Sequence, residues 1–260
     1  MAKQKTRDKT AKAENDAMPV TGHLRELRSR ILTCLATLAV TMLVGLRFVR
    51  GIVQALLAMG ERYGYQFVYI APQELLLQYF STDLLLALCV TLPVLLYEVW
   101  AFLRPGLRKN ERTLFLLGML FGLLSAAAGI LFAYKILLPF TLYFLISLSE
   151  GSGVRASVSV QNYVSFLLTI FLIFAAVFEL PAVTLLLTQF GILKVEWLKR
   201  VRKFAIVAIF FVAAVITPPD VVSQVMVAVP LLLLYEFSIF LCSLVSRLRK
   251  REAQEYEEKE

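Results

Sequence analysis

The sequence predicts an all-α polytopic membrane protein that crosses the bilayer six times. Of its 260 residues, 59% are hydrophobic, whereas a soluble domain of this size is closer to half apolar. The apolar residues form long continuous runs separated by charged clusters, which is typical of helical membrane proteins. No run alternates between apolar and polar residues, and this argues against a transmembrane β-barrel.

Six apolar segments are predicted to span the membrane: residues 31–48, 83–102, 113–138, 162–190, 204–216 and 221–244. Pro93 should kink the second of these, at a cost that neighbouring helices offset. The fifth is only about 20 Å long as a helix, against a hydrocarbon core of about 30 Å. It ends in the abrupt turn Thr217-Pro-Pro-Asp220. We therefore expect helices five and six to be short or to form a hairpin.

The segments between these spans differ in character. Residues 51–80 contain apolar pairs at the spacing of a short amphipathic helix. Residues 139–161 are expected to form a large loop with a flexible Gly-Ser-Gly centre. Residues 191–203 are expected to form a basic loop.

Charge divides the chain into a membrane domain and two polar ends. We expect a disordered basic arm over residues 1–17, the six-span domain over 18–246 and a charged tail over 247–260. Met18 is an alternative start, and no signal peptide is visible. Of the 27 Lys and Arg residues, 22 lie in four segments: 1–30, 103–112, 191–203 and the tail. All four fall on one side of a six-span arrangement, so both termini are predicted to be cytoplasmic.

Residue content argues against several classes of function. The only histidine is His23, which excludes a His-based zinc site or a Ser-His triad within the membrane. No Gly-rich loop followed by Lys-Ser or Lys-Thr is present, so we expect no nucleotide hydrolysis. The three cysteines lie in apolar runs and are expected to be packing residues: Cys34, Cys89 and Cys242. We therefore expect no enzyme, no cofactor and no metal.

The formal charge of +8 does not point to nucleic acid. The basic residues stand beside the apolar runs, where orientation in the membrane and anionic lipid account for them. Membrane lipid is therefore the expected partner of this charge.

The stretch that leads into the first span contains one acid, Glu26, among several arginines. Leu24, Leu27 and Ile31 form a narrow apolar stripe for the membrane surface or a neighbouring helix. Glu26 is placed to pair with Arg30 at i+4, which is worth only a few tenths of a kcal/mol. It is also placed to receive a cation from outside the chain. The sequence leaves both interpretations open.

Glu111 is a second acid surrounded by bases, in the loop before the third span. Together, Glu26 and Glu111 form a hypothetical clamp for a ligand with two adjacent guanidinium groups, because Arg–carboxylate pairs can be bidentate. A plain structural role for Glu111 is an acid at a helix start, which the helix dipole favours.

Four further acids lie within or at the ends of the spans: Asp83, Glu98, Glu179 and Glu236. Asp83, Glu98 and Glu236 are near span ends, where reaching the interface is the simplest interpretation. Glu179 lies well inside an apolar run, next to Leu180-Pro181. Such an acid usually faces the protein interior or a wet cavity, so it either lines a functional groove or is internally paired.

Several strings together resemble the TatC subunits of the twin-arginine protein translocase, over the chain from Met18 to about Leu244. They are His23-Leu-Arg-Glu-Leu-Arg28, Pro93-Val-Leu-Leu-Tyr-Glu-Val-Trp-Ala-Phe-Leu-Arg-Pro105, Glu111-Arg112, Phe178-Glu-Leu-Pro181 and Thr217-Pro-Pro-Asp-Val-Val-Ser-Gln224. The last is the most specific. Departures from the family pattern are Asn110 where histidine is common, a first external segment without proline, and the Lys-rich arm.

The resemblance implies a core receptor subunit in the bacterial cytoplasmic membrane. It implies binding of the twin-arginine signal peptides of folded precursors, through residues that match the family's binding region: Glu26, Glu111, Phe102, Arg28 and Leu24. It also implies contacts with TatA- and TatB-like single-span subunits at matching positions: Glu179, Gln224, Thr217 and Asp220. An oligomeric complex and export driven by the proton gradient are implied as well.

Two other functions compete with this one. A secondary transporter of a small solute would need broken helices and polar groups at the midplane, often in repeated halves. Only Glu179 fits that description, and we find no internal repeat. An assembly scaffold with passive acids is the third possibility.

Overall fold

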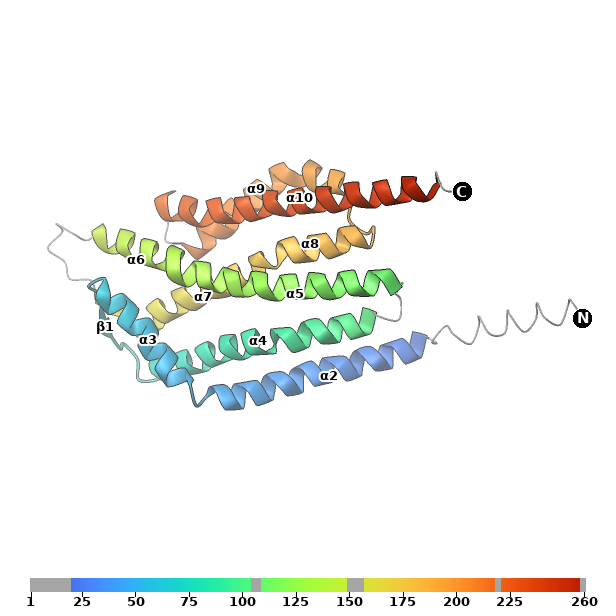
Figure 1. The fold of residues 1–260 in the computed structure, drawn as a ribbon. Coiled ribbons are helices and arrows are strands. Elements are labelled where there is room, and N and C mark those ends of the chain that lie inside the picture. Colours follow the sequence, from blue (N-terminus) through green and yellow to red (C-terminus); the bar gives the residue numbers. More distant parts are fainter. Residues whose placement is uncertain (1–19, 104–108, 149–156, 218–220, 258–260) are drawn as a thin grey trace, which may run out of the picture.

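Long helices run back and forth along one direction, as Figure 1 shows for this computed structural model. The structure describes residues 20–103, 109–148, 157–217 and 221–257, with side chains over 24–102, 115–148, 157–217 and 221–247. The elements in order are α2 (Val20–Gly45), α3 (Val49–Arg62), β1 (Gln66–Val68), α4 (Glu74–Leu103), α5 (Lys109–Phe132), the π-helical turn η2 (Ala133–Leu137), α6 (Leu138–Ser147), β2 (Ser157–Ser159), α7 (Val160–Phe178), α8 (Leu180–Gln189), α9 (Val195–Ile216) and α10 (Val221–Glu257).

Five stretches of the described helices are long and apolar enough to cross a membrane: Leu24–Gly45, Glu74–Phe102, Phe115–Ser147, Val160–Gln189 and Val221–Arg247. The expected count of six is therefore only partly met. The remaining segment, α9, has 22 residues, but its first half carries Glu196 and four bases. Its apolar part is as short as the sequence predicted.

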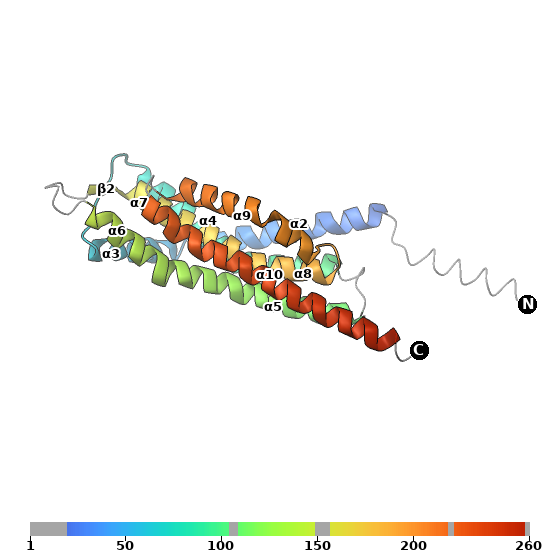
Figure 2. The same cartoon turned by 90° about the horizontal axis from the view of Figure 1, so that it is seen from above.

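The predicted hairpin at the end of the chain is formed by α9 and α10, which pack against each other (Figure 2). Helix α10 also packs on α8. Of the two expected forms, short helices or a hairpin, the hairpin is the one observed for α10, which is itself long and continues for 37 residues to Glu257. The tail beyond residue 246 thus begins as a continuation of this helix.

Two predicted loops are partly helical. The third span continues past Pro139 to Ser147, because Pro139 stands in the first turn of α6, directly after the π-helical turn, where a missing N–H is tolerated. The basic loop expected over 191–203 is short, since α9 already begins at Val195. Pro93 lies inside α4, as predicted.

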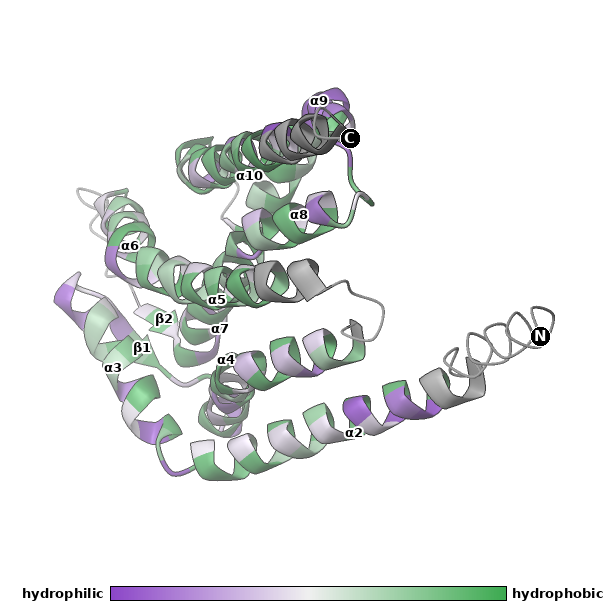
Figure 3. Ribbon diagram, turned by 45° about the vertical axis from the view of Figure 1, so that its right-hand side comes forward, coloured by the Kyte–Doolittle hydropathy of each residue, from purple (hydrophilic) through white to green (hydrophobic). Residues whose placement is uncertain are grey.

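One end of the bundle carries a cap made of α3, β1 and β2 (Figure 3). The predicted amphipathic helix is α3, and its apolar face is buried, including Val53 and Leu56. Strands β1 and β2 pair in parallel over three residues, a small exception to the all-α prediction. The Tyr65 hydroxyl donates to the Leu142 carbonyl at 3.1 Å, and the Tyr163 hydroxyl donates to the Leu56 carbonyl at 3.0 Å. These bonds tie the cap to α6 and α7.

The opposite end of the bundle collects the basic segments. The start of α2, the end of α4, the start of α5 and the end of α10 lie there together (Figure 1). Hydrophilic residues, purple in Figure 3, gather on the first part of α2 and on α9. Glu26, near the start of α2, and Glu111, near the start of α5, both belong to helix turns at this end of the bundle.

Candidate functional site

Helices α2 and α4 bring two acids onto one arginine, which we call the Arg30 cluster: Glu26, Arg30 and Glu98. The Nε of Arg30 donates to Glu26 Oε1 at 3.1 Å, and a second guanidinium nitrogen bonds to the same oxygen. The third nitrogen, Nη1, donates to Glu98 Oε2 at 2.8 Å. The i,i+4 pair read from the sequence is therefore confirmed, with Glu98 as an additional partner.

The Arg30 cluster is half-buried rather than exposed. Side-chain exposure is 23% for Arg30, 24% for Glu26 and 14% for Glu98. Water screens such a group less than a surface pair, so its charges interact more strongly. The position of Glu98 near a span end suggested that it simply reaches the membrane interface. Instead, it pairs with Arg30. The sequence could not reveal this pairing, because 68 residues separate Glu98 from Arg30.

The other residues predicted to bind the signal peptide differ in how exposed they are. Phe102 lies one turn beyond Glu98 on α4 and is half-buried. Leu24 is 60% exposed, and Arg28 is also exposed, so both lie on a face of α2 that the described chain leaves uncovered. Glu111 belongs to α5, but its side chain lies outside the described residues.

Glu179 lies at a break between α7 and α8. Pro181 has no N–H to donate back into the helix, and the Glu179 N–H bonds three residues back, to the Ala176 carbonyl at 3.2 Å. Its Oε1 is buried and has no hydrogen-bond partner among the described residues. A Cβ on Gly122 of α5 would lie 2.7 Å from Glu179 Oε2, so glycine allows the carboxylate to approach that helix.

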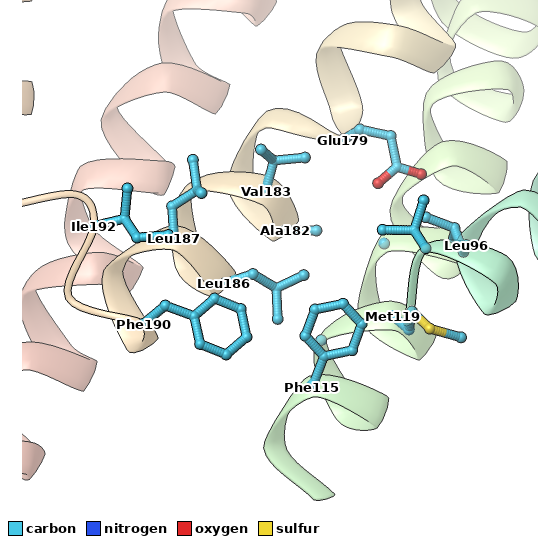
Figure 4. Close-up of a pocket in the computed structure, with 13 residues that line it drawn as sticks. Leu96, Phe115, Met119, Glu179, Ala182, Val183, Leu186, Leu187, Phe190 and Ile192 are labelled. Atoms are coloured by element: carbon cyan, nitrogen blue, oxygen red, sulfur yellow. The ribbon is translucent and has the colours of Figure 1, made fainter. Parts of the chain in front are cut away.

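An apolar cavity of about 480 Å³ opens beside this carboxylate (Figure 4). Residues of α4, α5, α8 and the positions on either side of α8 line it: Leu96, Val99, Phe115, Gly118, Met119, Gly122, Glu179, Ala182, Val183, Leu186, Leu187, Phe190 and Ile192. Glu179 lies at one end, and the rings of Phe115 and Phe190, 5.7 Å apart, lie at the other. Of the two predicted roles for Glu179, its surroundings match the groove-lining one.

The predicted contact residues near the turn between α9 and α10 form hydrogen bonds within the hairpin. Gln224 Nε2 donates to the Phe210 carbonyl at 3.1 Å, which links α10 to α9. Thr217 Oγ1 donates to the Ala213 carbonyl at 2.9 Å and is buried. Asp220 lies outside the described residues. Glu179 faces α5, so it belongs to a different helix pair from Gln224.

Asp83 and Glu236 differ in their surroundings. Glu236 pairs with Arg202 at 2.8 Å on the surface, which agrees with a position at the interface. Asp83 is fully buried, so the prediction that it reaches the interface is wrong. Its side chain packs against Gly45 of α2, where an added Cβ would lie 2.0 Å from Oδ1. Neither of its carboxylate oxygens has a partner among the described residues.

Comparison with known proteins identifies the family. A family model described as Sec-independent protein translocase protein (TatC) matches residues 22–230. The chain belongs to the TatC family. It is 34% identical to the TatC of Halalkalibacterium halodurans, over 94% of this chain and 98% of the relative. It is 35% identical to the TatC of Aquifex aeolicus, over 90% of this chain and 98% of the relative.

A solved structure agrees with this assignment. The crystal structure of the twin arginine translocase receptor TatC superposes with a TM-score of 0.77 and 34% identity, covering 86% of this chain and 99% of that one. This TatC-family chain is therefore a multi-pass membrane subunit of the twin-arginine translocation pathway and not an enzyme, as the sequence predicted. Family membership favours the translocase over the small-solute transporter.

Proposed function

We propose that this chain is the core receptor that binds the twin-arginine signal peptides of folded precursors at the cytoplasmic face. In this proposal, Glu26 takes one guanidinium and Glu111 the other, with Phe102, Leu24 and Arg28 beside them. The receptor also organises TatA- and TatB-like single-span subunits into an oligomeric complex for export driven by the proton gradient.

The observation that carries the proposal is that Glu26 already binds a guanidinium, that of Arg30. The carboxylate is half-buried and approached by Nε and a terminal nitrogen, a geometry that suits arginine and not lysine. The exposed arginines nearby repel a cation that can pair with only one of the two acids. This repulsion favours a ligand that carries two guanidinium groups.

Peptide binding to the purified full-length chain tests this proposal. A labelled twin-arginine peptide should bind far more tightly than its twin-lysine counterpart. Glu26→Gln and Glu111→Gln should each weaken the twin-arginine peptide, while Glu236→Gln serves as a matched control on a surface acid. Equal affinity of wild type and the Glu26→Gln/Glu111→Gln double variant would overturn the proposed function.

For the single-span subunits, we propose contacts at Glu179 and at the end of the α9–α10 hairpin, with Thr217, Asp220 and Gln224. A buried carboxylate beside an apolar cavity suits a partner helix that carries one hydrogen-bond donor in an apolar sequence, because such a donor is costly to leave unpaired in lipid. The bonds of Thr217 and Gln224 within the hairpin support an indirect role, in which they hold α9 and α10 in the shape that the partner meets.

We propose that α9 is a short sixth span, so that both termini are cytoplasmic. The basic bias supports this orientation, since the start of α2 and the end of α10 lie at the same end of the bundle (Figure 1). The short apolar part of α9 would thin the bilayer locally. Single cysteines introduced near residues 20 and 250 should react with an impermeant thiol reagent only from the cytoplasmic side. Labelling of either from the outside would overturn the orientation.

A further inference from the structure

Arg30 occupies the same carboxylate that the proposed function assigns to the ligand. The oxygen Glu26 Oε1 accepts two N–H groups of Arg30, one of them Nε at 3.1 Å. An incoming guanidinium therefore has to displace a guanidinium of the chain itself, and the two compete for one acceptor.

Glu98 changes the cost of this displacement. It already accepts Nη1 of Arg30 at 2.8 Å, from the facing helix α4, and it is the most buried of the three side chains. Without such an acceptor, displaced Arg30 would be a half-buried cation with no counter-charge, next to an arriving cation. Unpaired charges in such positions are strongly unfavourable. With Glu98, Arg30 can leave Glu26 and still remain paired.

We propose that Arg30 is a built-in place-holder for the ligand's guanidinium, and that Glu98 is the positioning residue that retains Arg30 when the ligand takes Glu26. This inference rests on the proposed function and goes beyond it. Arg30 has an acceptor on each of the two facing helices, Glu26 on α2 and Glu98 on α4. The exchange thus replaces one guanidinium on Glu26 Oε1 by another, and Arg30 stays paired with Glu98 throughout.

A simple brace between α2 and α4 is the competing role for the Arg30–Glu98 pair. These helices have other polar contacts that do not involve Arg30. Thr41 Oγ1 and Thr91 Oγ1 are 3.0 Å apart, and Asp83 packs on Gly45. Thr91→Val therefore provides a matched control, because it removes an interhelical hydrogen bond and leaves the Arg30 cluster intact.

The test measures the affinity of the full-length chain for a fluorescent twin-arginine peptide, in wild type, Glu98→Gln, Arg30→Gln, the double variant and Thr91→Val. Glu98→Gln should weaken binding about tenfold, because Arg30 then has only Glu26 to pair with. Arg30→Gln should bind as tightly as wild type or tighter, because the competitor is gone. The double variant should return to within about threefold of wild type, since Glu98 is needed only while Arg30 is present.

The signature of a place-holder is that Glu98→Gln weakens peptide binding when Arg30 is present and has little effect when Arg30 is replaced. Wild-type affinity in Glu98→Gln would overturn the inference, as would a double variant as weak as Glu98→Gln. A loss in Thr91→Val equal to that in Glu98→Gln would overturn it in favour of the brace. Glu26→Gln separates the two proposals: if Glu26→Gln loses binding and Glu98→Gln does not, only the place-holder fails. If Glu26→Gln binds normally, the proposed function fails.

Discussion

Glu26 and Glu179 are both half-buried acids in a largely apolar chain, yet their surroundings are opposite. Glu26 shares a guanidinium with Glu98 at the end of the bundle that collects the basic segments. Glu179 lies at a helix break beside an apolar cavity, and its Oε1 has no partner among the described residues. A paired acid can exchange one cation for another, whereas an acid beside an empty apolar space suits a hydrogen-bond donor brought by a helix.

The largest expected effect is the loss of peptide binding in Glu26→Gln. The neutral amide cannot form a charge-assisted bidentate pair, so the affinity for a twin-arginine peptide should fall about a hundredfold. Binding of single-span subunits, measured by co-purification, should stay the same. A parallel loss of both activities would mean that the two acids do not act separately.

Glu179→Leu should give the reverse pattern. Co-purification of a TatA- or TatB-like subunit should fall about tenfold, because the partner's donor then has no acceptor in an apolar site. Peptide affinity should remain within about twofold of wild type. Val183→Leu, which enlarges a side chain in the same cavity wall, is the control for the change in shape. Full recruitment in Glu179→Leu would remove Glu179 from the partner contact.

Asp83 sharpens the comparison, because it is buried without a partner among the described residues and is not one of the residues that line the Glu179 cavity. We expect a purely structural role for it. Gly45→Ala should lower the free energy of unfolding by about 1 kcal/mol, since the new Cβ meets Asp83 Oδ1. Thermal unfolding in detergent measures this. Adding Asp83→Ala should recover part of the loss, and peptide affinity should not change in either variant.

The smallest expected effect is at the cap, remote from both acids. Burial raises the pKa of the Tyr65 phenol, so it remains a neutral donor to the Leu142 carbonyl at physiological pH. Tyr65→Phe removes this hydrogen bond and should cost about 0.5–1 kcal/mol of unfolding free energy. A raised folded pKa means that the contribution is present below about pH 10 and is lost as pH rises further. The deficit of Tyr65→Phe should therefore shrink in strongly alkaline solution.

Sequence reasoning predicted the features that depend on local pattern. Continuous apolar runs located the long helices and apolar pairs located α3. The position of Glu236 near a span end correctly indicated an exposed acid. Pro139 misled the prediction, because a proline in the first turn of a helix is tolerated and α6 continues through it. The length of α10 was also missed. The apolar run ends at about Leu244, but charged residues can continue a helix beyond the membrane, and α10 extends to Glu257.

Long-range pairings could not be read from local spacing. The i,i+4 distance indicated that Glu26 and Arg30 pair, but nothing in the sequence connects Arg30 with Glu98 across 68 residues. In the same way, the sequence placed Glu179 inside an apolar run, while the cavity beside it depends on how α4, α5 and α8 come together. The burial of Asp83 depends on Gly45, in another helix.

Photo-crosslinking of the signal peptide tests the separation of the two acids most directly. A twin-arginine peptide with a photoreactive residue next to its arginines should crosslink to α2 near Leu24 and to residues 103–112, and not to the cavity wall at Val183 or Leu186. A photoreactive single-span subunit should crosslink to that wall instead. Crosslinks of the peptide's arginine region to Val183 or Leu186, and none near Leu24, would contradict the account.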